Sequence, residues 1–242
     1  LGAIRRIHWT STHWFRTQAY YDSSAWRATW AGEGGGVLLN QAPHQLDMLC
    51  WLFGSPAAVN GFCAFGRYHD IEVEDDVTAY LEWADGTHGV FITGTGEAPG
   101  TNRLEIAAEN GRLVLEHDRL VFHRNESPMS GFSRTTPELF AAPKVEVEVF
   151  EGLDHGPQHL GILRNFAAAI RGEEPLIAPA QEGLASVELA NALLLSSWEN
   201  RRVALPLDAA LFARHLDAQI AASTNQKTVR PADAGDMTGS FR

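Results

Sequence analysis

The stretch DDVTAYLEWADGTHGVFITGTG, residues 75–96, decides the fold class. Apolar and polar residues alternate on both sides of Ala84-Asp85-Gly86, and such alternation is typical of a β-strand with one buried face. A short turn containing Asp-Gly between two such runs predicts a β-hairpin. Further runs of the same period predict an antiparallel sheet, with strands near 4–12, 57–67, 75–84, 87–96, 102–108, 111–116, 119–123 and 144–150.

Helical periodicity precedes and follows this set of strands. Apolar residues recur at helical spacing through residues 38–53, and Gly54 supplies a stop signal. Pro43 is tolerable only in a first helical turn, so the helix is predicted to begin near Asn40 or Gln41, with Asn40 as its N-cap. Three later helices are predicted at 157–171, 180–200 and 208–221. Helices on both sides of the sheet in sequence are expected to cover one of its faces.

These elements predict one α+β domain over residues 1–222, a predominantly antiparallel open-faced β-sheet with helices packed on one face. The segment 124–143 is expected to cross the surface or an edge of the sheet. A polar tail, residues 223–242, is expected to be disordered or to lie on a neighbouring molecule.

The uncovered sheet face has its own consequence. It is expected to carry Val77, Ala79 and Leu81 or the residues that alternate with them, together with Phe91 and Ile92. An exposed apolar face of that size is a liability in a monomer. We therefore expect a homodimer or homotetramer built through this face.

Composition restricts the partners and the compartment. The 19 Lys and Arg residues against 30 Asp and Glu residues give a net charge of −11, which disfavours nucleic acid and membrane surfaces as partners. No stretch approaches the roughly 18 apolar residues of a membrane span. Cys50 and Cys63 lie in apolar patterns and are predicted to be buried thiols, with a disulfide or a reactive cysteine as the alternatives. A cytoplasmic location fits these features best.

The densest polar cluster is GGGVLLNQAPHQLDMLCWLFG, residues 34–54. Asn40, His44 and Asp47 are spaced four and three apart, so a helical turn would bring them toward one face. A neutral imidazole between two short polar side chains suits a proton acceptor. A capping or core histidine is the alternative from spacing alone. A metal site is disfavoured, because no second pair of ligands stands at zinc spacing.

A second group of candidates comes from the segment YYDSSAWRATWAGEGGG, residues 20–36, and the residues just before it. The segment has no steady period and is predicted to be a long connection, which in compact domains is more often functional than not. Arginine binds vicinal hydroxyls or a carboxylate, and aromatic rings stack on sugar rings, so the candidate substrate-binding residues are Arg16, Tyr20, Trp26 and Arg27. Edge packing with a surface ion pair is the alternative.

Two histidines and two aspartates complete the polar candidates. His155 and His159 stand at the start of the predicted helix 157–171 and either reach the rim of the substrate pocket or cap the helix. Asp75 and Asp76 interrupt a strand pattern with charge, and we interpret them as solvated residues at a sheet edge.

The stretch WRATWAGEGGGVLLNQAPHQLDMLCWLFG, residues 26–54, resembles the signature of the C-terminal domain in a family of NAD(P)-dependent oxidoreductases. This is the glucose-fructose oxidoreductase, inositol dehydrogenase and rhizopine-catabolism family. Residues 157–175 and 178–208 are similar to its late helix and to its final helix with a Leu-Pro-Leu run. The resemblance covers nearly the whole chain and implies the fold of a glyceraldehyde-3-phosphate-dehydrogenase-like C-terminal domain.

The resemblance also implies roles for single residues. His44 matches the family histidine that lies beside the substrate hydroxyl and shares the acid–base work, and Asp47 matches the aspartate three residues later. Asn40 stands where many members have an aspartate. Since an asparagine can only exchange hydrogen bonds, recognition of a substrate hydroxyl is its expected role. Trp26 and Arg27 resemble the Trp-Arg pair that precedes the glycine run.

A dinucleotide site requires a strand, a G-x-G-x-x-G turn and a helix N-terminus. Glycines 32, 34, 35 and 36 lack this spacing, and the two lysines, Lys144 and Lys227, lie outside the lysine motif of the family. An N-terminal dinucleotide-binding domain is therefore expected to be absent from this sequence, so that NAD or NADP serves the full-length enzyme and neither binds these residues alone.

The resemblance thus implies the catalytic-pocket half of an NAD(P)-dependent dehydrogenase that oxidises a secondary alcohol of a sugar, inositol or related polyol. The alternative is a non-catalytic module that binds carbohydrate or drives oligomerisation.

Overall fold

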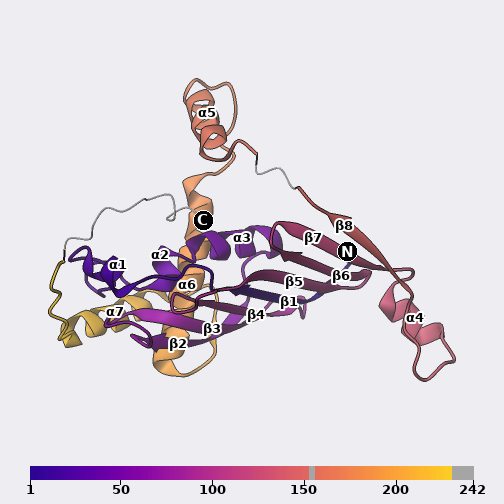
Figure 1. Ribbon diagram of the computed structural model, residues 1–242, viewed down its shortest axis with the longest axis horizontal. Helices are drawn as coiled ribbons and strands as arrows, with labels where there is room; N and C mark the ends of the chain where they lie inside the picture. Colours follow the sequence, from indigo (N-terminus) through magenta and orange to yellow (C-terminus); the bar gives the residue numbers. More distant parts are fainter. Residues whose placement is uncertain (153–155, 231–242) are drawn as a thin grey trace.

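The computed structural model describes residues 1–152 and 156–230. The strands within these residues form one nine-stranded sheet of order β8-β7-β6-β5-β1-β4-β3-β2-β9 (Figure 1). Neighbouring strands are antiparallel except for β1 and β4, which are parallel. The strands are β1 Ile4–Ser11, β2 Ala58–Phe65, β3 Glu74–Glu82, β4 His88–Gly94, β5 Asn102–Ala108, β6 Gly111–Glu116, β7 Arg119–Asn125, β8 Val145–Phe150 and β9 Val203–Ala204.

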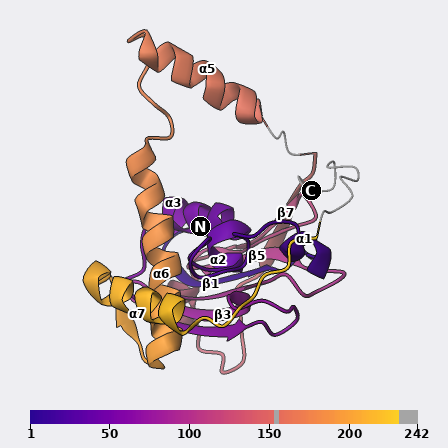
Figure 2. The same cartoon turned by 90° about the vertical axis from the view of Figure 1, so that its left-hand side faces the viewer.

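Helices cover one face of this sheet. Those of the described residues are α1 Gln18–Asp22, α2 Val37–Asn40, α3 Pro43–Phe53, α4 Met129–Thr135, α5 Gln158–Ile170, α6 Gly183–Glu199 and α7 Ala209–Ala222, with a short 3₁₀ turn at Ala180–Glu182. Helix α6 contacts β2, α3 and α7. Helix α4 lies at the far end of the sheet beyond β8, inside the segment predicted to cross an edge, and α5 stands away from the sheet (Figures 1 and 2). The predicted α+β fold with an open-faced sheet is confirmed.

The core lies between the sheet and helices α2, α3 and α6. Alternate strand residues and apolar residues of the three helices form one buried cluster, with Phe91 and Leu193 fully buried. Gly61 of β2 allows α6 to approach closely, because a Cβ there would lie 2.4 Å from the Leu193 carbonyl oxygen. The site candidates on α1, α2 and α3 therefore rest on a rigid base.

The orientation of the central strands corrects part of the prediction for the uncovered face. Val77, Ala79, Leu81 and Phe91 are all at most 1% exposed and belong to the core cluster. The prediction that Phe91 and Ile92 both point outward is wrong for Phe91, because successive strand residues point to opposite faces.

The uncovered face is more polar than predicted. The residues that alternate with the buried ones, Thr78, Tyr80 and Ile92, lie on it. It also carries ion pairs, with Arg6 Nη2 2.5 Å from Glu105 Oε1 and Arg103 Nη1 2.7 Å from Glu116 Oε2. Apolar side chains remain exposed near its two edges, at Phe62 of β2 and along β8.

The start of α3 differs from the prediction. Asn40 is the last residue of α2 and caps nothing, while α3 begins at Pro43 with Ala42 as its N-cap. The cap of the earlier helix comes from the sheet, because Glu74 Oε1 accepts hydrogen bonds from the Gly36 N–H at 2.8 Å and the Leu38 N–H at 3.0 Å. A Cβ on Gly36 would lie 2.0 Å from the Glu74 carbonyl oxygen, so this position requires glycine.

The segment after α7 is described as far as residue 230. This part of the predicted polar tail lies along the chain's own loop, with the Arg230 N–H donating to the Asp22 carbonyl at 3.0 Å. Residues 231–242 of the tail lie outside the described residues. Within the described ranges, no helix has the length and apolar character that crossing a membrane requires.

Candidate functional site

The side chain of Tyr20 is the centre of a polar network between α1, the following loop and α2. Its hydroxyl donates to Asn40 Oδ1 at 3.0 Å and accepts from Arg27 Nη1 at 2.6 Å and Gln41 Nε2 at 3.2 Å. A phenol hydroxyl has one proton and two acceptor sites, so this hydroxyl is fully used. The structure thus brings together three predicted site residues: Tyr20, Arg27 and Asn40.

The amide of Asn40 is nearly saturated as well. Its Oδ1 accepts from Tyr20 and, at 2.7 Å, from Gln41 Nε2, while its Nδ2 donates to Glu33 Oε1. Glu33 Oε2 in turn accepts from the Ala28 N–H at 2.7 Å, which fixes the loop that carries Arg27. One amide hydrogen of Asn40 is left over for a ligand. Glu33 and Gln41 are site residues that the sequence analysis missed.

Two guanidinium groups lie close to the Tyr20 ring. Arg16 Cζ lies 5.1 Å and Arg27 Cζ 4.4 Å from its centroid, within the range of cation–π attraction. Arg27 also stacks at 4.6 Å on Trp26, which is 48% exposed. The predicted residues Arg16, Tyr20, Trp26 and Arg27 therefore form one aromatic and cationic surface.

Hydrogen bonds hold the backbone of Arg16 at both its N–H and its carbonyl. Its N–H donates to the Thr95 carbonyl at 2.9 Å, and its carbonyl accepts from His69 Nε2 at 2.9 Å. Burial and the Arg16 charge lower the pKa of the neighbouring His13. Within the described part of the chain, the buried donors Arg16 Nε and Trp14 Nε1 have no hydrogen-bond partner. Unsatisfied donors beside two arginines favour a ligand that offers acceptor oxygens.

His44 and Asp47 lie apart from this network in their contacts. Both are exposed on the first two turns of α3 and line a cavity of about 550 Å³ together with Met48, residues 178–180 and the start of α6. Among residues 1–152 and 156–230 neither side chain forms a hydrogen bond or ion pair, so the His44 imidazole is available to a ligand. The structure does not join Asn40 to His44 or Asp47 as the spacing suggested, because the helix is interrupted between Asn40 and Pro43.

The two late histidine candidates are His155 and His159. His159 is exposed on α5, which stands away from α1 and α2 in both views (Figures 1 and 2). His155 lies outside the described residues. His159 therefore does not contribute to the network around Tyr20 described above.

The interpretation of Asp75 as a solvated edge residue is wrong. Its side chain is 0% exposed and lies in β3, where Oδ2 stands 2.9 Å from His69 Nδ1 and accepts from the Tyr68 N–H at 2.8 Å. The other nitrogen of the His69 ring donates to Arg16, so Asp75 supports the cationic surface through one intermediate. Asp76 is half-buried and pairs with Arg67 at 2.9 Å.

Glu74 is a further residue that the sequence analysis missed. It is 0% exposed, and burial raises the pKa of its carboxyl group to about 7 in spite of the two N–H donors at Oε1. Its second oxygen has no partner within the described residues. The residues the structure describes contain no group of three or more His, Cys, Asp and Glu placed to hold a metal ion.

Comparison with known proteins identifies the fold family. The sequence model of the GFO/IDH/MocA C-terminal domain matches residues 1–114, which include β1, the network around Tyr20, and α3. Over these residues the chain is similar to the C-terminal domain of the GFO/IDH/MocA family. The resemblance inferred from residues 26–54 is thereby confirmed, and the later helices match the solved structures described next.

Several solved structures similar to this chain are dehydrogenases in complex with NADH. The WlbA dehydrogenase of Chromobacterium violaceum, in complex with NADH and UDP-GlcNAcA, is 27% identical with a TM-score of 0.65, over 86% of this chain and 56% of that one. The WlbA dehydrogenase of Bordetella pertussis, with the same two molecules, is 25% identical with the same TM-score and coverage. A levoglucosan dehydrogenase in complex with NADH and levoglucosan shares the fold at 18% identity, with a TM-score of 0.65.

A curated relative carries no assigned activity. The uncharacterized protein y4oX of Sinorhizobium fredii is 24% identical over 178 residues, which are 71% of this chain and 46% of the relative. The chain thus spans about half the length of the relatives it matches. The C-terminal domain of an oxidoreductase fits these comparisons, and the activity, the substrate and the role of each residue are proposals.

Proposed function

We propose that this chain forms the substrate-binding half of an NAD(P)-dependent dehydrogenase that oxidises a secondary alcohol of a sugar, inositol or related polyol. The observation that carries the proposal is the surface made by Arg16, Tyr20, Trp26 and Arg27, tied to Asn40 by hydrogen bonds. An exposed aromatic ring beside donors suits a sugar ring with its hydroxyl groups. The relatives in complex with NADH support the reaction class.

Within this class we propose a substrate that carries a carboxylate. Two guanidinium groups lie within 5.1 Å of the centroid of one tyrosine ring, in a chain whose net charge is −11. A planar guanidinium binds a carboxylate through paired hydrogen bonds. The bound UDP-GlcNAcA of the WlbA dehydrogenases supports a sugar acid linked to a nucleotide.

We propose His44 as the acceptor of the hydroxyl proton, with Asp47 at the rim of the same cavity. Support comes from the exposed imidazole at the mouth of the cavity beside α6. Bound NAD or NADP supplies the hydride acceptor, and the glycines of this sequence do not form the turn that its pyrophosphate requires. The residues of this chain bind and orient the alcohol and take its proton.

The arm formed by α5 supports the need for a separate nucleotide-binding domain. Leu160, Leu163, Phe166 and Ile170 recur at helical spacing and are 52%, 65%, 54% and 72% exposed, on a helix that stands away from the sheet (Figure 2). Water is a poor environment for so continuous an apolar stripe. The relatives hold NADH in chains of which the match covers 56%, and we propose that such a domain covers this stripe.

The test uses the product of the complete gene and two ligands that differ in one group, UDP-glucuronate and UDP-glucose. We expect calorimetry to show an affinity for UDP-glucuronate at least tenfold higher than for UDP-glucose. In a separate activity assay, we expect sugar acids to support the reduction of NAD or NADP. In Arg27→Gln the preference should fall to within about threefold, while exposed Arg164→Gln should retain it. Equal affinity of the unaltered protein for both ligands would exclude the carboxylate. Carbohydrate binding without any turnover would favour the non-catalytic module instead.

Self-association through the uncovered sheet face is a further proposal. Exposed Phe62 and Tyr80, at 63% and 37%, lie on this face near one edge, and Val147 and Val149 lie on it near the other. Their burial against a second copy would give a homodimer or homotetramer. We also propose a cytoplasmic location, because Cys50 and Cys63 form no disulfide.

A further inference from the structure

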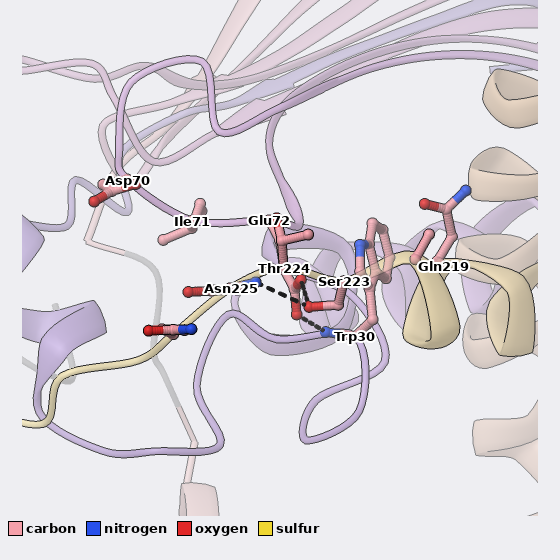
Figure 3. Close-up of a pocket in the computed structure, with 10 residues that line it drawn as sticks. Trp30, Asp70, Ile71, Glu72, Gln219, Ser223, Thr224 and Asn225 are labelled. Carbon is pink, nitrogen blue, oxygen red and sulfur yellow. Dashed lines mark hydrogen bonds between the residues drawn. The ribbon is translucent and has the colours of Figure 1, made fainter.

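The segment that follows α7 runs across the base of the loop that carries Arg27. We call residues 223–230 the strap. Together with Trp30 and residues 70–72 it lines an open cavity of about 490 Å³, and Figure 3 shows it passing close to Glu72 and Trp30. The helix before it, α7, packs on α6, so the strap begins from a fixed point.

Three attachments tie the strap to the loop. At its start, Ser223 Oγ donates to Glu72 Oε2 at 2.5 Å, and Glu72 Oε1 accepts from the Trp30 N–H at 2.8 Å (Figure 3). In its middle, Lys227 Nζ donates to the Arg27 carbonyl at 2.7 Å. At its described end, the Arg230 N–H donates to the Asp22 carbonyl at 3.0 Å. The contacts lie along the loop from residue 22 to residue 30.

The central attachment is made by the partly buried side chain of Lys227. The Lys227 ammonium is placed among the carboxylates of Asp22, Glu33, Glu72 and Asp70, and its hydrogen bond goes to a backbone carbonyl. Burial lowers its pKa, and these four carboxylates act in the opposite direction. The other lysine, Lys144, is exposed and directly precedes β8. The ammonium therefore holds an acidic loop together at the residue whose side chain contacts Tyr20.

The backbone around Arg27 is strained and is held from two sides. The residue after it, Ala28, adopts a φ of 53°, which is unfavourable for a residue with a Cβ and is maintained only by its surroundings. The Ala28 N–H is held by Glu33 from one side, and the Arg27 carbonyl by Lys227 from the other.

We propose that the strap sets the position of the Arg27 guanidinium and that Lys227 is a positioning residue for substrate recognition. The inference rests on the proposed function for its effect on substrate. Its effect on the loop is independent of any substrate.

The first part of the test measures the loop by hydrogen exchange in the complete gene product. The amides of Ala28 and Trp30 report directly, since each donates to a carboxylate of the network. We expect both to exchange at least tenfold faster in Lys227→Met and in a chain ending at residue 222, and to remain slow in Lys227→Arg and Lys144→Met. Unchanged protection of both amides in Lys227→Met overturns the proposal.

The second part measures the consequence for substrate. With UDP-glucuronate as the probe, Lys227→Met should raise KM about fivefold to tenfold and change kcat by less than about twofold, and Lys227→Arg should restore KM. A loss that arginine does not rescue, or one equally produced by Lys144→Met, also overturns it. If the protein does not use sugar acids at all, the proposed function fails while the exchange result still decides the role of the strap.

Discussion

The buried carboxyl group of Glu74 should make the stability of this domain depend on pH in an unusual direction. Burial raises its pKa from an ordinary value of 4.5 to about 7 in the folded chain. A raised carboxyl pKa means that the folded state retains the proton while the unfolded state ionises. The contribution of Glu74 to stability is therefore complete below pH 4.5 and is lost as pH rises through 7.

The size of the effect follows from the shift. A change from 4.5 to about 7, at about 1.36 kcal/mol per pKa unit, amounts to about 3 kcal/mol between the two ends of this window. Glu74→Gln removes the ionisation and keeps an oxygen that can accept from the Gly36 and Leu38 N–H groups. Its new amide hydrogens occupy the place of the unpartnered Oε2, which costs about 1–3 kcal/mol at every pH.

Urea denaturation at pH 4.5, 6, 7 and 8 measures this directly. The free energy of unfolding of the unaltered protein should fall relative to that of Glu74→Gln by about 3 kcal/mol across the series. Exposed Glu146→Gln is the matched control and should run parallel to the unaltered protein. Parallel curves for Glu74→Gln, within about 1 kcal/mol, would refute the assignment of the raised pKa to this residue.

The remaining predictions concern chemistry, assembly and cofactor. In the complete gene product His44→Ala should lower kcat by about 10²- to 10⁴-fold with a change in Tm below about 4 °C, and a loss of fold without loss of turnover would make it a structural residue. Asn40→Ala should raise KM, measured by steady-state kinetics, by a factor that corresponds to the free energy of roughly one or two hydrogen bonds. For residues 1–242, Phe62→Asp should reduce the mass measured by light scattering toward the monomer mass of 26.5 kDa, whereas Leu139→Asp should not. A monomeric unaltered protein would contradict the proposed oligomer. Calorimetry on residues 1–242 should show no micromolar binding of NAD or NADP, and such binding would contradict the expected absence of a nucleotide site.

Local patterns were sufficient to predict most of the sheet and the long helices. Alternation with a period of two indicated the hairpin of β3 and β4, and helical periodicity indicated α6. The bounds of these elements agree with the prediction within about three residues. The short helices α1 and α2 were missed, because four or five residues are too few to show a period. Phe91 and Ile92 were assigned to one face because the prediction counted apolar residues and did not follow the alternation.

The site was predictable only in part for a different reason. Arg16, Tyr20, Trp26 and Arg27 were grouped correctly since they stand close together in the sequence. The partners that fix them come from far away: Glu74 caps α2 from 36 to 38 residues along the chain, and Lys227 reaches Arg27 across 200 residues. A charge in an aperiodic stretch gives no local indication of such a partner.

The position of β1 has a consequence for how the chain reaches its folded state. The strands β2 to β4 form one ribbon of consecutive hairpins and β5 to β8 another, and β1 lies between them, with Ile7 opposite Gly89 on one side and Ile106 on the other. The strands of each ribbon are close in sequence, although residues 126–144 separate β7 from β8. The seam, in contrast, needs contacts between residues about 80 to 100 positions apart, which are slow to form. We therefore expect β1 to pair with the two ribbons after the hairpins within each ribbon have formed. If β1 alone detached, the sheet would separate between β5 and β4, and both strands would become exposed edges able to pair with a neighbouring molecule.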